Sequence, residues 1–185
     1  DLDLSALVRR ACPGLGEAEA AAYAAPLPAA RYKAGVRRFA NLVADHPDAA
    51  IFTSLPKSGT VRAARLLAEI GDARGRFPTP QALVCLAGAA PSTRQSGKVK
   101  VVTFRWAVDK QLRGAVIDFA GDSHHANPWA ADLYQRARAR GHDHPHAVRI
   151  LARAWLHIIW RCWQDGVAYD PDKHHALQRV LAQAA

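Results

Sequence analysis

The feature that most limits the possible folds is the stretch from Leu55 to Asp72, LPKSGTVRAARLLAEIGD, in which a short glycine-containing turn precedes a helical pattern. The apolar residues after the turn recur at the spacing of one helix face: Val61, Ala64, Leu67 and Ala68. This order of apolar residue, proline, turn and amphipathic helix predicts a helix-hairpin-helix.

The rest of the chain also shows helical patterns, so the predicted fold is mainly α. The further predicted helices cover residues 5–11, 17–25, 29–45, 81–87, 104–120, 128–140, 145–165 and 172–184. Residues 89–103 are expected to be extended or looped, and VKVV at 99–102 is the only plausible short strand. We therefore expect a helical domain at 46–185 with at most one short strand region, preceded by a short helical appendage at 1–45. His46-Pro47-Asp48 marks the predicted boundary.

Charge indicates a polyanionic partner. The chain has a net charge of +9 and a pI near 10.0, and nearly all of the excess lies after residue 45. Six basic residues fall between Arg94 and Arg113, and a second basic cluster follows: Arg136, Arg138 and Arg140. Both could follow a nucleic-acid backbone. An ordinary solvated helix face is the alternative.

Several motifs in order give the chain from about His46 onward a resemblance to a known family. They are LPKSGTVRAARLLAEIGD, RFPTPQALVCLAGAAPSTRQSGK, the basic segment that follows, and HAVRILARAWLHIIWRCWQDGVAYDP. This part resembles the C-terminal domain of bacterial insertion-sequence transposases of the one-ten family. The resemblance implies a DNA-recombining enzyme with an N-terminal RuvC-like domain, whose carboxylates bind Mg²⁺, and a C-terminal domain with a nucleophilic serine. It further implies DNA as partner, a guide RNA, and a homo-oligomer in the intact family.

Carrying the family's serine onto this sequence makes Ser96 the predicted nucleophile. A serine hydroxyl needs a proton acceptor, or cations that stabilise the charge on an attacked phosphate. Basic residues surround Ser96 in the sequence and are predicted to bind nucleic acid: Arg94, Lys98, Lys100 and Arg105. The alternative, which the residues alone would favour, is a surface turn with solvated cations. With the resemblance, the catalytic interpretation is favoured.

The turn before the helix is the second predicted nucleic-acid contact. Backbone N–H groups at a helix N-terminus favour a phosphate. The residues predicted to bind there are Lys57, Ser58, Gly59, Arg62 and Arg65. Related hairpins often have glycine at both ends of the turn, whereas this turn has Gly59 alone. The alternative is an ordinary helix start with Ser58 or Thr60 as the N-cap.

Residues 4–43 resemble a different family. The patterns AAYAAPLP and YKAGVRRF are similar to the cap region of haloalkane dehalogenases, although the nucleophilic Asp and catalytic His of that family have no counterpart here. The chain contains no Met. We therefore expect a truncated transposase joined to a dehalogenase remnant, and no transposition by this chain alone because the acidic domain is missing. The alternatives are a non-catalytic nucleic-acid-binding remnant and an inert fusion product.

The remaining residues predict neither a metal site nor a membrane segment. Three scattered Cys and a His-rich run lack zinc-finger spacing, so no metal or other cofactor is expected in this chain beyond adventitious binding. No apolar run is long enough to span a membrane, and a cytoplasmic location is expected. One aromatic stripe is predicted to form the core rather than to stack on bases, with His157 as a satisfied core histidine: Trp106, Trp129, Trp155, Ile158, Ile159 and Cys162.

Overall fold

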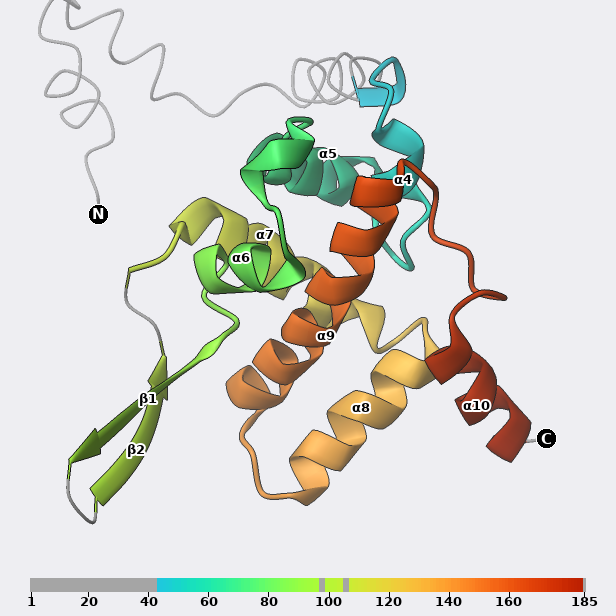
Figure 1. The fold of residues 1–185 in the computed structure, drawn as a ribbon. Coiled ribbons are helices and arrows are strands. Elements are labelled where there is room, and N and C mark those ends of the chain that lie inside the picture. Colours follow the sequence, from blue (N-terminus) through green and yellow to red (C-terminus); the bar gives the residue numbers. More distant parts are fainter. Residues whose placement is uncertain (1–42, 97–98, 105–106, 185) are drawn as a thin grey trace, which may run out of the picture. The chain divides into compact units, whose positions relative to one another are not determined.

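Capping side chains fix the starts of most helices. The computed structural model describes residues 43–96, 99–104 and 107–184. In it, Thr79, Asp109, Asn127 and Asp143 each accept a backbone N–H hydrogen bond in the first turn of the helix that follows. The described elements, in chain order (Figure 1), are α4 (Ala49–Thr53), α5 (Gly59–Ile70), the 3₁₀ turn η1 (Arg74–Arg76), α6 (Pro80–Leu86), β1 (Pro91–Ser96), β2 (Val99–Phe104), α7 (Lys110–Ser123), α8 (Pro128–Ala139), α9 (His144–Asp165) and α10 (His175–Ala184).

The prediction of a mainly α fold is confirmed in the described part of the chain. The helices predicted at 81–87, 128–140 and 145–165 match α6, α8 and α9 to within one residue at each end. They match because a cap and a nearby proline mark each start in the sequence. The helices predicted before residue 43 lie outside the described residues.

The helix predicted at 104–120 is placed differently in the structure. Residue 104 ends β2, and α7 begins only after Asp109, whose carboxylate accepts from the N–H groups of Gln111 and Leu112. The helix also continues past Gly121, because the Ser123 hydroxyl donates to the Ala120 carbonyl at 2.8 Å and holds the last turn. The last helix begins at His175 rather than at Asp172.

Trp155 lies at the centre of the core, on α9. Its indole is fully buried and makes edge-to-face contacts with the rings of Phe119, Trp129 and Tyr169, at centroid distances of 5.3, 5.0 and 5.6 Å. Its Nε1 donates to the Ser123 hydroxyl at 2.8 Å. The predicted aromatic core is thus confirmed for Trp129 and Trp155. The remaining predicted tryptophan, Trp106, lies outside the described residues.

The two strands form one antiparallel hairpin, which projects from the helices (Figure 1). Its register pairs Pro91 with Phe104 at the root and Ser96 with Val99 at the tip. The sequence predicted only part of β2, and β1 was expected to be extended or looped. At the root, the Asp109 N–H donates to the Leu86 carbonyl at 3.0 Å and ties the start of α7 to the end of α6.

All described residues belong to one compact unit that covers residues 40–185. The predicted dehalogenase-like appendage, residues 4–43, lies almost wholly outside the described residues, and the boundary at residue 45 stays a prediction. In the described ranges, no helix is both long enough and apolar enough to cross a membrane.

Candidate nucleic-acid interface

Ser96, the predicted nucleophile, is the last residue of β1. It is exposed and lies in register with Val99 at the tip of the hairpin. Arg94 belongs to the same strand and Lys100 to the partner strand, so the backbone brings two predicted phosphate-binding residues into the element that presents the serine. The other predicted cations of this segment, Lys98 and Arg105, lie outside the described residues.

The turn before α5 has an unusual backbone. Lys57 and Gly59 have positive φ angles, 58° and 53°, on either side of Ser58, which has helical angles. Such alternation points neighbouring N–H groups in similar directions and is typical of anion-binding turns. The turn follows α4, so two helices flank it, as a helix-hairpin-helix requires, and that assignment stays a prediction.

Ser58 has a different environment from its neighbours in the turn. Its side chain is 2% exposed, and its N–H donates to the Leu55 carbonyl at 3.0 Å. Ser58 occupies the N-cap position of α5, as one of the alternative interpretations expected, but its side chain makes no capping hydrogen bond. The amide of Ser58 is used within the turn, which leaves Lys57 and Gly59 as its exposed residues.

Arg62 and Arg65 form ion pairs with α7. Arg62 Nε lies 3.3 Å from Asp118 Oδ2, and its Nη2 binds Asp122 Oδ2. Arg62 Nη1 also donates to the Lys57 carbonyl at 3.0 Å, which braces the turn. Arg65 Nη1 lies 3.4 Å from the same Asp118 oxygen. The two positive charges are balanced by two carboxylates, so these paired arginines link α5 to α7.

A pocket of about 350 Å³, which we call the basic pocket, lies between the segment after α6, α7 and the first turns of α9. Three cations line it, and no acidic residue of the described chain does so; its lining is Gly88, Lys110, Arg113, Gly114, Ile117, Pro145 and Arg149. Burial lowers the pKa of Arg149, and the nearby Arg113 lowers it further, against the opposing effect of Asp143. The sequence placed Lys110 and Arg113 in a basic run, but gave no signal that Arg149 of α9 would join them.

The second basic cluster predicted from the sequence is partly used within the fold. Arg136 Nη2 lies 2.7 Å from Asp132 Oδ2 within α8, and Arg138 Nη1 donates to the His142 carbonyl at 2.8 Å. Arg140 is exposed at the end of the helix. Only part of this cluster's charge is therefore available to a partner.

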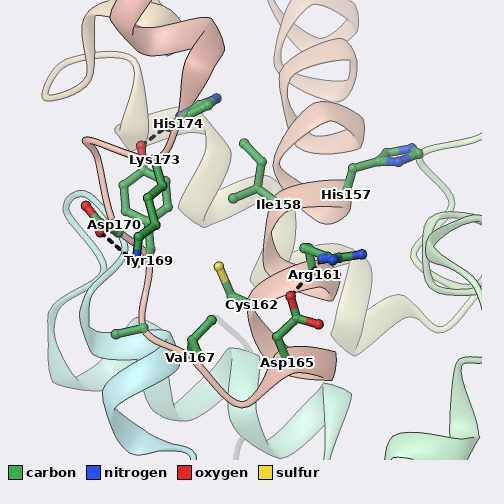
Figure 2. Close-up of a pocket in the computed structure, with 11 residues that line it drawn as sticks. His157, Ile158, Arg161, Cys162, Asp165, Val167, Tyr169, Asp170, Lys173 and His174 are labelled. Carbon is green, nitrogen blue, oxygen red and sulfur yellow. Dashed lines mark hydrogen bonds and ion pairs between the residues drawn. The ribbon is translucent and has the colours of Figure 1, made fainter.

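A second cavity, of about 390 Å³, lies between the C-terminal half of α9 and the segment that leads to α10 (Figure 2). Figure 2 shows Ile158, Cys162 and Val167 between two ion pairs, Arg161 with Asp165 and Lys173 with Asp170. Burial raises the pKa of the Cys162 thiol. Because each cation has its own carboxylate, this cavity offers an anion no net positive charge.

His157 also lines the second cavity, where it is only partly buried. No hydrogen bond joins it to another described residue, so the prediction of a satisfied core histidine is wrong. The reason is that this position of α9 faces the cavity and not the core. Partial burial and then the charge of Arg153 lower the pKa of His157.

Histidines gather near the start of α9 without forming a metal site. The Tyr134 hydroxyl lies 2.8 Å from His144 Nδ1, and the Tyr134 ring stacks on the His124 ring at a centroid distance of 4.2 Å. The ring centroids of His142 and His146 are also 4.2 Å apart. Burial lowers the pKa of both His124 and His146, so neutral rings are favoured. Across the described ranges, no three His, Cys, Asp or Glu side chains are arranged to hold a metal ion.

Comparison with known proteins shows which family part of this chain resembles. Residues 49–135, from α4 into α8, match the model of the family described as "Transposase IS116/IS110/IS902 family". The matched region includes the α5 turn and the whole hairpin with Ser96. Residues 49–135 are thus similar to an insertion-sequence transposase family.

Three curated proteins are similar over most of this chain. One, of Streptomyces coelicolor, is named as a mini-circle transposase for IS117 and is 37% identical over 76% of this chain and 33% of its own length. An insertion element IS110 protein of 43.6 kDa from the same organism is 34% identical over 70% of this chain and 32% of its own length. An IS900 protein of 42 kDa from Mycobacterium paratuberculosis is 32% identical over 68% of this chain and 32% of its own length. This chain therefore spans about a third of the relatives it matches.

Proposed function

We propose that this chain is the DNA-binding C-terminal part of an insertion-sequence transposase and that Ser96 is its nucleophile. The observation that supports this most is the position of Ser96, exposed at the tip of a hairpin with basic residues in both strands, inside the region that matches the transposase family. A side chain at the tip of a two-stranded hairpin can reach a DNA backbone that the helical body does not enclose.

The proposed step is a transesterification. Ser96 Oγ loses its proton and attacks the phosphorus of a DNA phosphodiester. The new Oγ–P bond replaces one P–O bond to deoxyribose, and the departing oxygen takes up a proton, so no net proton is gained or lost. One phosphoester bond is exchanged for another, so no external energy source is required. Positive charge from Arg94, Lys98 and Lys100 would stabilise the extra negative charge on the phosphate in the transition state.

DNA binding in this proposal uses the hairpin and the α5 turn. Lys57 and Gly59 supply the exposed part of the turn, and Lys57 contributes a point charge where related hairpins have glycine. Since the chain spans about a third of its relatives, Mg²⁺, a guide RNA and a homo-oligomer would belong to the whole assembly. We expect this chain alone to bind DNA without cutting it.

Trapping of a covalent adduct tests the nucleophile. The full chain is joined to the N-terminal part of a relative and incubated with that relative's element DNA and RNA, and protein–DNA adducts are resolved in denaturing gels. Ser96→Ala should abolish the adduct and leave DNA affinity unchanged, because it removes the attacking oxygen and no cation. Ser92→Ala, in the same strand, is the matched control and should retain the adduct. An adduct that persists in Ser96→Ala would refute the assignment.

The second candidate function is nucleic-acid binding without catalysis. It is favoured by the observation that three cations line the basic pocket, because cations can bind a phosphate without any nucleophile. The adduct experiment separates the two candidates. Salt-sensitive DNA binding in a joined protein that never forms an adduct would support the second.

A further inference from the structure

The basic pocket is built by segments that are distant in the sequence. Gly88 follows α6, Lys110 and Arg113 belong to the first turn of α7 and the turn after it, and Arg149 comes from α9. Like charges repel, so three cations around one cavity of about 350 Å³ raise the electrostatic energy of the unoccupied fold. An anion in the cavity would relieve that repulsion.

Asp109 and Asp143 cap the two helices that supply the cations of the pocket. Asp109 accepts from the N–H groups of Gln111 and Leu112 in α7, and Asp143 accepts from the His146 N–H of α9. Asp143 also acts on Arg149 and raises its pKa, against the larger effect of burial. Asp118, further along α7, binds the paired arginines. Because the cap of α7 already uses its N–H groups, an anion in the pocket would bind through side chains.

Two glycines line the cavity, Gly88 and Gly114. A Cβ atom at Gly88 would lie 2.8 Å from Val108 Cγ1 and 3.5 Å from Arg113 Cδ, so the backbone there leaves no room for a side chain. At Gly114 a Cβ atom would lie 3.4 Å from Arg65 Nη2, which places one of the paired arginines close to this part of α7. Ile117 and Pro145 supply apolar surface beside the cations.

We propose that the basic pocket binds a backbone phosphodiester of a polynucleotide, and this inference rests on the proposed function. A guanidinium fork matches two phosphate oxygens, and Arg113 and Arg149 supply two such forks from different helices. Lys110 adds a compact charge. The apolar surface of Ile117 and Pro145 fits a deoxyribose better than water. Because Gly88 of the pocket lies three residues before β1 in the chain, a strand held there could continue along the hairpin towards Ser96.

The test measures binding of the full chain to a short fluorescent duplex DNA by anisotropy across a salt series. Arg149→Gln and the double variant Lys110→Gln/Arg113→Gln remove pocket charge. Arg153→Gln, one turn further along α9 and exposed, is the control for Arg149→Gln. Lys173→Gln combined with Arg161→Gln, at the second cavity, is the control for the double variant.

We expect Arg149→Gln to reduce the salt slope by about one and the double variant to weaken binding about tenfold at low salt, with little change in the controls. Pocket variants that bind like their controls, while the unmodified chain binds DNA, would overturn this inference and leave the proposed function standing. Absence of DNA binding by the unmodified chain at low salt would instead overturn the proposed function, and this inference with it.

Inorganic phosphate provides a further comparison. At constant ionic strength it should raise the melting temperature of the unmodified chain less than duplex DNA does, because a free ion makes no contacts outside the pocket. A phosphate effect as large as that of DNA, and lost in Arg149→Gln, would make a free anion the occupant and refute the polynucleotide assignment.

Discussion

The paired arginines of α5 and the basic pocket both lie against α7, and they differ in the acidic residues that α7 places beside the cations. Arg62 and Arg65 extend from α5 to Asp118 and Asp122 on α7, where positive and negative charges are equal. In the basic pocket, Lys110 and Arg113 of the same helix meet Arg149, and among the described residues no acidic side chain lines the cavity. One helix thus presents a neutral surface and a cationic one.

The difference shows why a count of basic residues cannot locate a binding surface. Counterion release, which drives non-specific binding to DNA, depends on phosphates neutralised by cations. An arginine that already has a carboxylate partner must lose it first, so its net contribution is small. The charge of +9 describes the chain, whereas Asp118 and Asp122 of α7 reduce what Arg62 and Arg65 can contribute.

The largest expected effect is on stability, at Gly88, one of the two glycines that line the basic pocket. Gly88→Ala should destabilise the fold by about 3 kcal/mol, because φ is +68° and the new Cβ would lie 2.8 Å from the stiff Val108 side chain. Gly59→Ala, at the start of the helix with the paired arginines, has φ +53° and open space around it, and should cost about 1 kcal/mol. Urea unfolding compares the two. Equal losses of stability in the two variants would contradict the close approach of Gly88 to Val108.

The helix starts could be predicted from the sequence, whereas the pairing of charges could not. Caps such as Thr79 and Asn127 act within three residues of their own position, so local sequence contains the signal. Arg62 meets Asp122 across 60 positions, a contact that depends on how α5 and α7 pack. No local pattern distinguishes it from a solvated arginine.

The hairpin, too, could be predicted only in part from the sequence. Its second strand has the β-branched run at 99–102, but β1, PSTRQS, has low strand propensity and forms through pairing with β2. Ser96 could be singled out only through the resemblance, because a serine beside cations is also typical of surface turns. Arg149 could not be assigned to a site at all, since α9 reaches α7 only in the packed fold.

The second prediction concerns Arg74, whose ion-pair partner Asp48 is buried. Arg74 binds Asp48 through two hydrogen bonds of 2.7 and 2.5 Å, and the Asp48 side chain is 11% exposed. Asp48→Asn should cost about 2 kcal/mol of stability at neutral pH and leave DNA affinity unchanged, because this pair stabilises the fold.

The pH dependence of this effect follows from the pKa of Asp48. The hydrogen bonds from Arg74 lower that pKa in the folded chain, so the contribution is complete above the unfolded value of about 4 and is lost as the pH falls through the folded value. Unfolding curves from pH 7 to pH 3 should therefore converge for the two proteins. A gap that stays constant in acid would contradict the ion pair.

The third prediction tests whether Asp118 and Asp122 keep the paired arginines from binding DNA. Asp118→Asn combined with Asp122→Asn should release the paired arginines and raise DNA affinity about tenfold at low salt, with a steeper salt dependence. Asp165→Asn combined with Asp170→Asn changes the net charge equally at the second cavity and is the matched control. Anisotropy titrations that give the same gain for both double variants would mean that overall charge, rather than release of the arginines, sets the affinity.

The smallest effect is expected at an ion pair within a single helix. Arg136 and Asp132 lie four positions apart on α8, with side chains 59% and 37% exposed. An exposed pair of this kind stabilises a helix by about 0.3–0.5 kcal/mol and is screened by salt.

A double-mutant cycle with Arg136→Gln and Asp132→Asn measures that coupling free energy by urea unfolding. It should be near its maximum at low salt and close to zero at 1 M salt, where the Debye length is about 3 Å. The same cycle on Arg62 and Asp122, which join two helices, should give the larger coupling because Arg62 is 26% exposed and also holds the Lys57 carbonyl. Equal couplings would mean that the paired arginines are ordinary surface pairs, so that the charges of α5 remain available to a phosphate.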